Sequence, residues 1–86
     1  MISEFIGTFI LVLAILVSGQ PIYIAAAFFA AITIAGGVSG GHLNPAVSLT
    51  MLAKGDIGMG SFIQYAGAQV AGALLALAVA KTLKKD

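Results

Sequence analysis

Apolar side chains dominate three long segments of the chain, residues 2–17, 22–38 and 58–80. Turn-forming or glycine-rich stretches separate these segments, so each is free to form its own helix. At ~1.5 Å of rise per residue, such helices reach roughly 24–35 Å, close to the thickness of a hydrocarbon core of ~30 Å. Only helices and closed barrels satisfy their backbone polar groups in lipid. The pattern therefore predicts an all-α membrane protein with three transmembrane helices.

A fourth apolar segment, residues 45–53, is too short to span a membrane and too apolar for an aqueous loop. Pro45 suits the first helical position, where its missing N–H costs nothing. A helix over this segment rises ~14 Å, about half of a hydrocarbon core. A glycine-rich stretch, residues 39–43, precedes it, and the charged turn at residues 54–56 returns the chain to the interface. We therefore expect a re-entrant half-helix.

Composition supports a bilayer as the solvent of this chain. Of 86 residues, 60% are hydrophobic and 8% are charged, whereas a soluble domain has about a quarter charged residues. A net charge of +1 and four scattered lysines argue against nucleic-acid binding. With no cysteine and a single histidine, His42, we expect no disulfide and no metal site. We also expect no cofactor. No nucleophile–base pair is suggested, so we expect no catalytic residues and no enzyme.

The first apolar segment is interpreted as a retained span and not as a secretory signal peptide. It carries Glu4 where a signal peptide has a basic region, and further membrane-length segments follow it. Lysines at the other end can extend their charged heads to the interface after the third span; these are Lys81, Lys84 and Lys85. A whole first helix and a basic stop favour a complete chain over a truncated or engineered fragment.

The third span carries small residues at intervals of four, Ala68, Gly72 and Ala76. Such rows let helix backbones approach closely in lipid, where packing drives association. Alanine and glycine are also common in membrane spans, so a purely compositional origin stays open. We favour a packing face.

The junction before the half-helix carries the chemistry of interest. Irregular backbone is tolerated at membrane depth only where protein covers it or where it lines a watery cavity. Asn44 at the N-cap can accept from a helix N–H and still offer its amide NH₂ to a passing oxygen. The helix dipole places partial positive charge there, which opposes cations and hydronium. An Asn-Pro pair is also an ordinary helix start, so by itself it leaves the function open.

This junction has a specific order of residues, Ser39-Gly40-Gly41-His42-Leu43-Asn44-Pro45-Ala46-Val47-Ser48. It resembles, almost residue for residue, the first signature loop of the major intrinsic protein family, the aquaporins and glycerol facilitators. Residues 4–9 resemble the opening of the family's first helix, and residues 65–73 resemble its third. The resemblance spans nearly the entire chain. It implies a pore motif at Asn44, Pro45 and Ala46 and a pore-lining loop at Ser39, Gly40, Gly41, His42 and Leu43.

The chain departs from the family because it contains one repeat, of the first-repeat type, where members have two inverted repeats. A lone half-helix would have no partner, and its irregular backbone would face lipid. We therefore hypothesise an antiparallel homodimer about a two-fold axis in the membrane plane. Because the family assembles its pores in fours, the resemblance implies eight chains. The implied function is passive passage of water, glycerol or other small neutral solutes. The alternative is a non-conducting membrane interaction or structural protein that pairs with another half or with a full-length channel.

Two indications of membrane orientation conflict. Three crossings put Lys54 and the amino terminus on one side and the C-terminal lysines on the other. The positive-inside rule places the C-terminus in the cytoplasm, whereas the family resemblance places the N-terminus there. Since the charge bias is small, insertion in both orientations is compatible with the sequence, although the membrane itself is not identified.

The resemblance also points to filter positions. The family carries an arginine after its second Asn-Pro-Ala motif; the matching position here is Val47, and the chain has no arginine. The filter position on the second helix falls at Ile24, where water-specific members carry an aromatic residue. Both candidates are apolar, so we expect looser selectivity that admits glycerol. A slip of one turn would bring Phe28 or Tyr23 there instead.

Three polar residues have two interpretations each. Glu4 is either an interfacial charge or, as the resemblance implies, a buried carboxylate that accepts hydrogen bonds from the re-entrant loop. Gln69 is expected to bond the loop or another helix as structural support, since a lipid-facing amide is costly. For His42 we favour a structural or pore-lining role over a pH gate.

Overall fold

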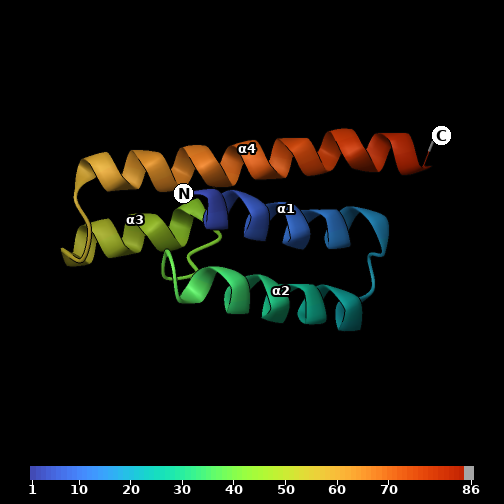
Figure 1. Ribbon diagram of the computed structural model, residues 1–86, viewed down its shortest axis with the longest axis horizontal. Helices are drawn as coiled ribbons and strands as arrows, with labels where there is room; N and C mark the ends of the chain where they lie inside the picture. The colour runs from blue at the N-terminus through green and yellow to red at the C-terminus, as the bar shows by residue number, and fades with distance from the viewer. Residues whose placement is uncertain (85–86) are drawn as a thin grey trace.

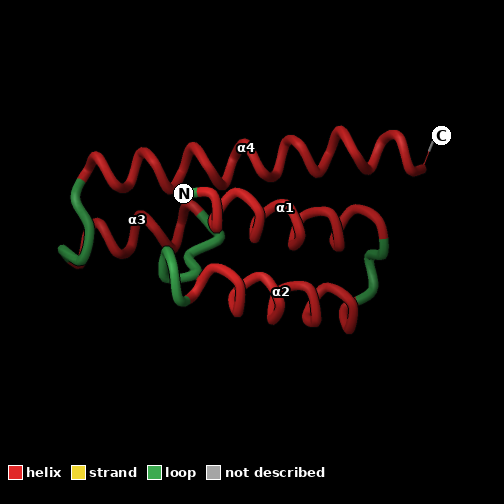
Figure 2. The backbone as a smooth tube through the Cα atoms, viewed as in Figure 1, coloured by secondary structure: helices red, strands yellow, loops and turns green. Residues whose placement is uncertain are grey.

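The computed structural model describes residues 1–84, and these form four helices and no strand. The helices are α1 (Ile2–Val17), α2 (Pro21–Gly36), α3 (Pro45–Lys54) and α4 (Met59–Lys84). Figures 1 and 2 show them running roughly parallel to one long axis. α3, with 10 residues, is the shortest of the four. The all-α prediction is confirmed. Lys85, which we expected to help end the last span, lies outside the described residues.

Helix ends follow from local backbone chemistry. α2 begins at Pro21 and stops at Gly36, two residues before the expected end, where a turn leads into the glycine-rich loop. α3 begins with Pro45 at its first position and ends at Lys54, and the capping residue Gly55 has a left-handed φ of 94°. There the Gly55 N–H donates to the carbonyls of Met51 and Leu52, a helix end that favours glycine.

The packing order differs from the chain order. α1 lies between α2 and α4, whereas α3 contacts only α4 among the helices. α2 therefore touches neither α3 nor α4. Figure 1 shows α3 beside the first half of α4, so that the start of α3 lies near the middle of the molecule. This places the glycine-rich loop, residues 37–44, where the ends of α1, α2 and α3 converge.

Small residues bring α1 and α4 together. A Cβ on Gly72 would collide with the carbonyl oxygen of Phe5 and lie 3.2 Å from the nitrogen of Phe9. Gly72 and Ala76 are buried, and Ala68 is half-buried. Gly72 is thus a point of close packing between α4 and α1, as expected for a packing face, and the burial of its row neighbours is compatible with that interpretation.

This contact gives a matched test of helix packing. Gly72→Ala should destabilise the fold by roughly 1–3 kcal/mol, because the new methyl group meets α1 backbone that cannot turn aside. Gly67→Ala is the control, since nothing lies within 4 Å of its Cβ position. We expect it to leave stability unchanged or to raise it slightly, because alanine favours helix over glycine. Thermal unfolding in detergent measures both; equal melting temperatures would contradict the close approach.

One helix of the described residues meets the length and composition of a membrane span, residues 59–83. α1 and α2 are also apolar but have sixteen residues each, which rise ~24 Å against a hydrocarbon core of ~30 Å. They are short because Gly19, with φ of 63°, and Pro21 fix a tight connection between them. The expectation of three full-length spanning helices is therefore met in length by α4 alone.

The exterior is apolar, and the largest buried side chains are polar. Large hydrophobic side chains such as Ile22, Phe29 and Leu74 are exposed, while the largest fully buried side chains are Gln69, Glu4 and Ser48. A soluble protein this small would not leave so much apolar surface in water. The distribution suits a chain surrounded by lipid or by further apolar helices.

Candidate functional site

Glu4 organises the site from the first turn of α1. Its side chain is 0% exposed. One carboxylate oxygen accepts from the backbone N–H of Leu43 at 2.7 Å and from Gln69 Nε2 at 3.0 Å. The other accepts from the N–H of His42 at 3.1 Å and from Ser39 Oγ at 2.5 Å. The carboxylate therefore joins the glycine-rich loop to both α1 and α4.

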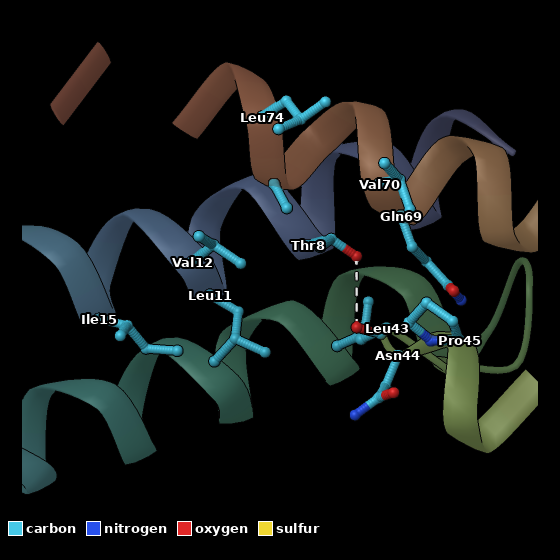
Figure 3. A pocket seen from close by; sticks show the side chains of 11 residues that line it. Thr8, Leu11, Val12, Ile15, Leu43, Asn44, Pro45, Gln69, Val70 and Leu74 are labelled. Carbon is cyan, nitrogen blue, oxygen red and sulfur yellow. Dashed lines mark hydrogen bonds between the residues drawn. The ribbon is translucent and has the colours of Figure 1, made fainter. Parts of the chain in front are cut away.

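The loop that Glu4 holds has an unusual backbone. Gly40, Gly41 and Leu43 all have positive φ, at 92°, 66° and 57°. Leucine rarely adopts this region, so two N–H bonds to Glu4 at residues 42 and 43 help keep it there. The Leu43 carbonyl is approached by Thr8 Oγ1 at 3.5 Å, as Figure 3 shows.

Carbonyl groups of this loop divide into two sets. Tyr65 donates its hydroxyl to the carbonyl of Ser39, and Thr8 faces that of Leu43. Within residues 1–84, no donor bonds the carbonyls of Gly40, Gly41 and His42. Three successive carbonyls are thus without a partner among residues 1–84, and they come shortly before the start of α3 in the chain.

Asn44 caps α3 and keeps donors free. Its Oδ1 accepts from the N–H of Ala46 at 2.7 Å, which also fixes which side-chain atom is the oxygen. Its Nδ2 has no partner among the described residues, nor has the N–H of Val47. Asn44, Pro45, Ala46 and Val47 are all exposed. We call these four residues the α3 tip; it carries the positive end of the helix dipole and unused donors.

His42 is anchored on both sides of its ring. Its Nδ1 lies 2.8 Å from Ser48 Oγ, and its ring stacks on Tyr65 with centroids 4.0 Å apart and an interplanar angle of 13°. Ser48 Oγ also accepts from Gln69 Nε2 at 3.1 Å, so this hydroxyl links the His42 ring to the side chain of Gln69.

Tyr65 offers a test of the loop's outer support. Tyr65→Phe keeps the stack on His42 but removes the bond to the Ser39 carbonyl, and we expect a loss of about 1 kcal/mol in stability. Tyr23→Phe is the control because that side chain is exposed and makes no hydrogen bond within residues 1–84. Thermal unfolding in detergent compares the two variants. An unchanged melting temperature for Tyr65→Phe would show that this hydroxyl does not stabilise the loop.

Some site residues were not singled out from the sequence. Thr8, Ser48 and Tyr65 all take part in the network, yet none was assigned a role. For Thr8 and Tyr65, the spacing along the helix could have indicated a role beside the polar residues already singled out. Glu4 and Thr8 are four residues apart, as are Tyr65 and Gln69, so each pair shares one face of its helix.

The filter candidates do not meet within one chain. Ile24 is half-buried in the first half of α2 and Val47 is exposed in the first turn of α3. These two helices share no contact. Phe28 and Tyr23, the positions for a slipped alignment, are exposed on α2. A filter that combines these positions therefore needs a second chain or a second half.

An open-sided cavity of about 390 Å³ lies beside the α3 tip along α1 and α4, and its wall residues Ile15, Val70 and Leu74 are exposed. Figure 3 shows Asn44 and Pro45 at one end of it and aliphatic side chains of both helices along its length. Its walls are mainly Leu11, Val12, Ile15, Val70, Ala73 and Leu74. The cavity is therefore lined mainly by apolar side chains, with the start of α3 at one end.

Comparison with known proteins agrees with this architecture. The model of the major intrinsic protein family matches residues 1–86. The glycerol uptake facilitator protein-like 6 of Lactiplantibacillus plantarum is 40% identical over 90 residues, covering 94% of this chain and 42% of the relative. Human aquaporin-9 is 41% identical over 92 residues, covering 90% and 31%. Aquaporin Z of Brucella melitensis is 41% identical over 92 residues, covering 90% and 40%. No solved structure matches significantly.

The chain belongs to the major intrinsic protein family, a class of integral membrane channels. Proteins of this family are channels and not enzymes, as expected from the sequence. The chain spans less than half the length of the curated relatives it matches.

Proposed function

We propose that this protein forms a passive channel for water and small neutral solutes, glycerol among them, by pairing with a second half in inverted orientation. The α3 tip carries the proposal. Its free Asn44 Nδ2 follows directly on the three open carbonyls of residues 40–42. Names of the relatives, a glycerol uptake facilitator and aquaporins, support the same class of solute.

Three helices would cross the membrane, α1, α2 and α4, with α3 as a re-entrant half-helix. The apolar exterior of α1 and α2 and the family membership support this topology. Their length of ~24 Å leaves a mismatch of a few ångströms, which local thinning of the bilayer or snorkelling flanks accommodate at modest cost. The two termini then lie on opposite sides.

The proposed second half is another copy of this chain, turned upside down. A two-fold axis in the membrane plane would bring two α3 tips together near the midplane. The exposed tip and the missing contact between α2 and α3 support a partner at this place. Four such pores, made of eight chains, would follow the family's assembly. Insertion in both orientations supplies the two kinds of copy.

Permeation would need no cofactor. A neutral molecule passes its hydrogen-bond donors along the carbonyls of residues 40–42 and presents its oxygen to Asn44 Nδ2. Cations and hydronium are disfavoured, because two helix N-termini place partial positive charge at the same point. Each step exchanges one hydrogen bond for another, so diffusion alone carries the solute.

Selectivity would depend on positions contributed by both copies. Inverted pairing would bring Val47 of each copy toward Ile24 of the other copy. The two pairs are related by the two-fold axis, so the pore would have two equivalent filters. Both side chains are apolar and neither offers a fixed donor or charge. We therefore propose passage of glycerol in addition to water.

Stopped-flow light scattering of proteoliposomes tests the proposal. Shrinkage in sucrose should be several-fold faster than in protein-free vesicles, and re-swelling in glycerol should also accelerate. Vesicles holding the protein but shrinking at the lipid rate would favour the alternative, a non-conducting interaction or structural protein.

A further inference from the structure

The side chain of Leu43 is buried between α1 and α2. Leu43 directly precedes the exposed Asn44, yet its own side chain is only 3% exposed. It forms a cluster of buried apolar residues with Ala31 and Ala35 of α2. On the α1 side, a Cβ on Gly7 would lie 2.6 Å from Leu43 Cδ2, whereas carbon atoms in ordinary contact are ~3.5–4.0 Å apart. We call these three small residues, Gly7, Ala31 and Ala35, the Leu43 seat.

The backbone of Leu43 indicates that this side chain has a task of its own. Its φ of 57° lies in the left-handed region, which glycine adopts freely and leucine does not. The two glycines before His42, Gly40 and Gly41, have the same sign of φ without a side chain. A leucine in this conformation is held by the seat and by its N–H bond to Glu4. Backbone conformation alone therefore does not explain a leucine at this position.

The place of the α3 tip depends on the residue before it. α3 packs against α4, where Gln69 donates to Ser48, and contacts neither α1 nor α2. The distance of the tip from α1 and α2 is thus set through the loop. Leu43 is joined to Asn44 by one rigid peptide, with Cα atoms ~3.8 Å apart. A displacement of Leu43 from its seat is therefore passed on to Asn44.

We propose that Leu43 is a positioning residue for Asn44, because the depth of its side chain in the seat sets how far the α3 tip stands from α1 and α2. The inference rests on the proposed function, in which solutes pass Asn44. It adds a determinant of selectivity that is separate from Ile24 and Val47. A filled seat moves the tip away from α1 and α2 into the path of the solute, so it narrows the path and excludes glycerol more than water.

Nuclear magnetic resonance in detergent follows Asn44 without any need for flux. Asn44 is the only asparagine of the chain, so asparagine with a ¹⁵N-labelled side chain gives a single pair of NH₂ signals. Gly7→Ala should shift this pair, because the new methyl group must push Leu43 Cδ2 about 1 Å away to reach ordinary contact. Gly67→Ala is the control, since nothing lies within 4 Å of its Cβ position. It should leave the pair in place.

A second substitution decides whether Leu43 transmits the change. Leu43→Ala empties the seat and should also shift the Asn44 signals. When Gly7→Ala is combined with Leu43→Ala, the new methyl group meets no Cδ2 and partly fills the seat, so the signals should return toward their parental positions. This comparison holds even if Gly7→Ala alone does not fold. A leucine that only stabilises the fold would lower the melting temperature and leave the Asn44 signals of folded protein unchanged, and that result would overturn the inference.

Proteoliposomes with equal amounts of folded protein test the consequence for selectivity. Gly7→Ala should lower glycerol flux about tenfold and water flux only about threefold, since one methyl group in a fitted site changes discrimination by roughly such factors. Gly67→Ala should keep both rates. An unchanged ratio of glycerol flux to water flux would overturn the role in selectivity while the channel stands. A parent protein without flux, but with Asn44 signals that follow the seat, would overturn the channel and retain Leu43 as the residue that positions the tip.

Discussion

Replacing Asn44 by leucine is expected to abolish water flux while leaving the protein in the membrane. The substitution removes the free Nδ2 donor and puts a branched apolar side chain at the α3 tip. Losing the N-cap should cost about 1 kcal/mol, which is small beside the stability of a folded domain. Stopped-flow shrinkage of proteoliposomes, normalised to protein content, should fall to the rate of empty vesicles.

Asn44→Asp separates capping from donation. The aspartate keeps an oxygen for the Ala46 N–H and suits a helix N-terminus, so helix stability should be retained. It offers no NH₂ group and brings negative charge to a point that otherwise repels cations. We expect reduced water flux and a new cation leak, read by a pH- or potassium-sensitive dye. If both Asn44 variants conduct water as fast as the parent protein and show no cation leak, Asn44 does not line the pore.

Glu4→Ala is expected to have the largest effect on folding. Four donors converge on this carboxylate, two of them backbone N–H groups of the loop. Removing the acceptor leaves them unpaired inside the protein at ~1–3 kcal/mol each. The sum approaches the ~5–15 kcal/mol that stabilises a typical domain. We therefore expect little folded protein after detergent extraction, with early proteolysis within residues 37–44.

Two further variants calibrate this result. Glu4→Gln keeps the volume but turns an NH₂ group toward other donors, so it should fall between Glu4→Ala and the parent. Ser3→Ala removes only the 2.9 Å bond to Ser39 Oγ at the edge of the cluster and should cost about 1 kcal/mol. Size-exclusion chromatography and thermal unfolding give the order. A Glu4→Ala protein as stable as Ser3→Ala would show that the loop is held by other contacts.

Local chemistry explains which parts of the fold were predictable. The start of α3 follows from Pro45, because proline suits a first helical position. Its end one residue later than expected follows from Gly55, which alone adopts the left-handed turn without strain. The apolar segments became helices because lipid-facing backbone must bond within its own segment.

The contacts between helices were less predictable, because the spacing of residues along one helix does not show which other helix packs against that face. Gln69 was expected to bond the loop or another helix, and its actual partners are Glu4 and Ser48, from α1 and α3. The sequence also did not predict that the closest approach of α4 to α1 falls at Gly72. Ala68 and Ala76 are small residues of the same row, so either could have marked that point equally well. The function was inferred from the ordered motif at residues 39–48, because composition alone indicates only a membrane protein.

The orientation of the two chains within one dimer tests the central claim most directly. Lys54→Cys, at the exposed end of α3, is labelled on intact cells with an impermeant maleimide, and the dimer is then solubilised for native mass spectrometry. Inverted pairing predicts one label on each dimer, because one copy exposes this end outside and the other inside. Dimers carrying only two labels or none would show parallel copies and contradict the account.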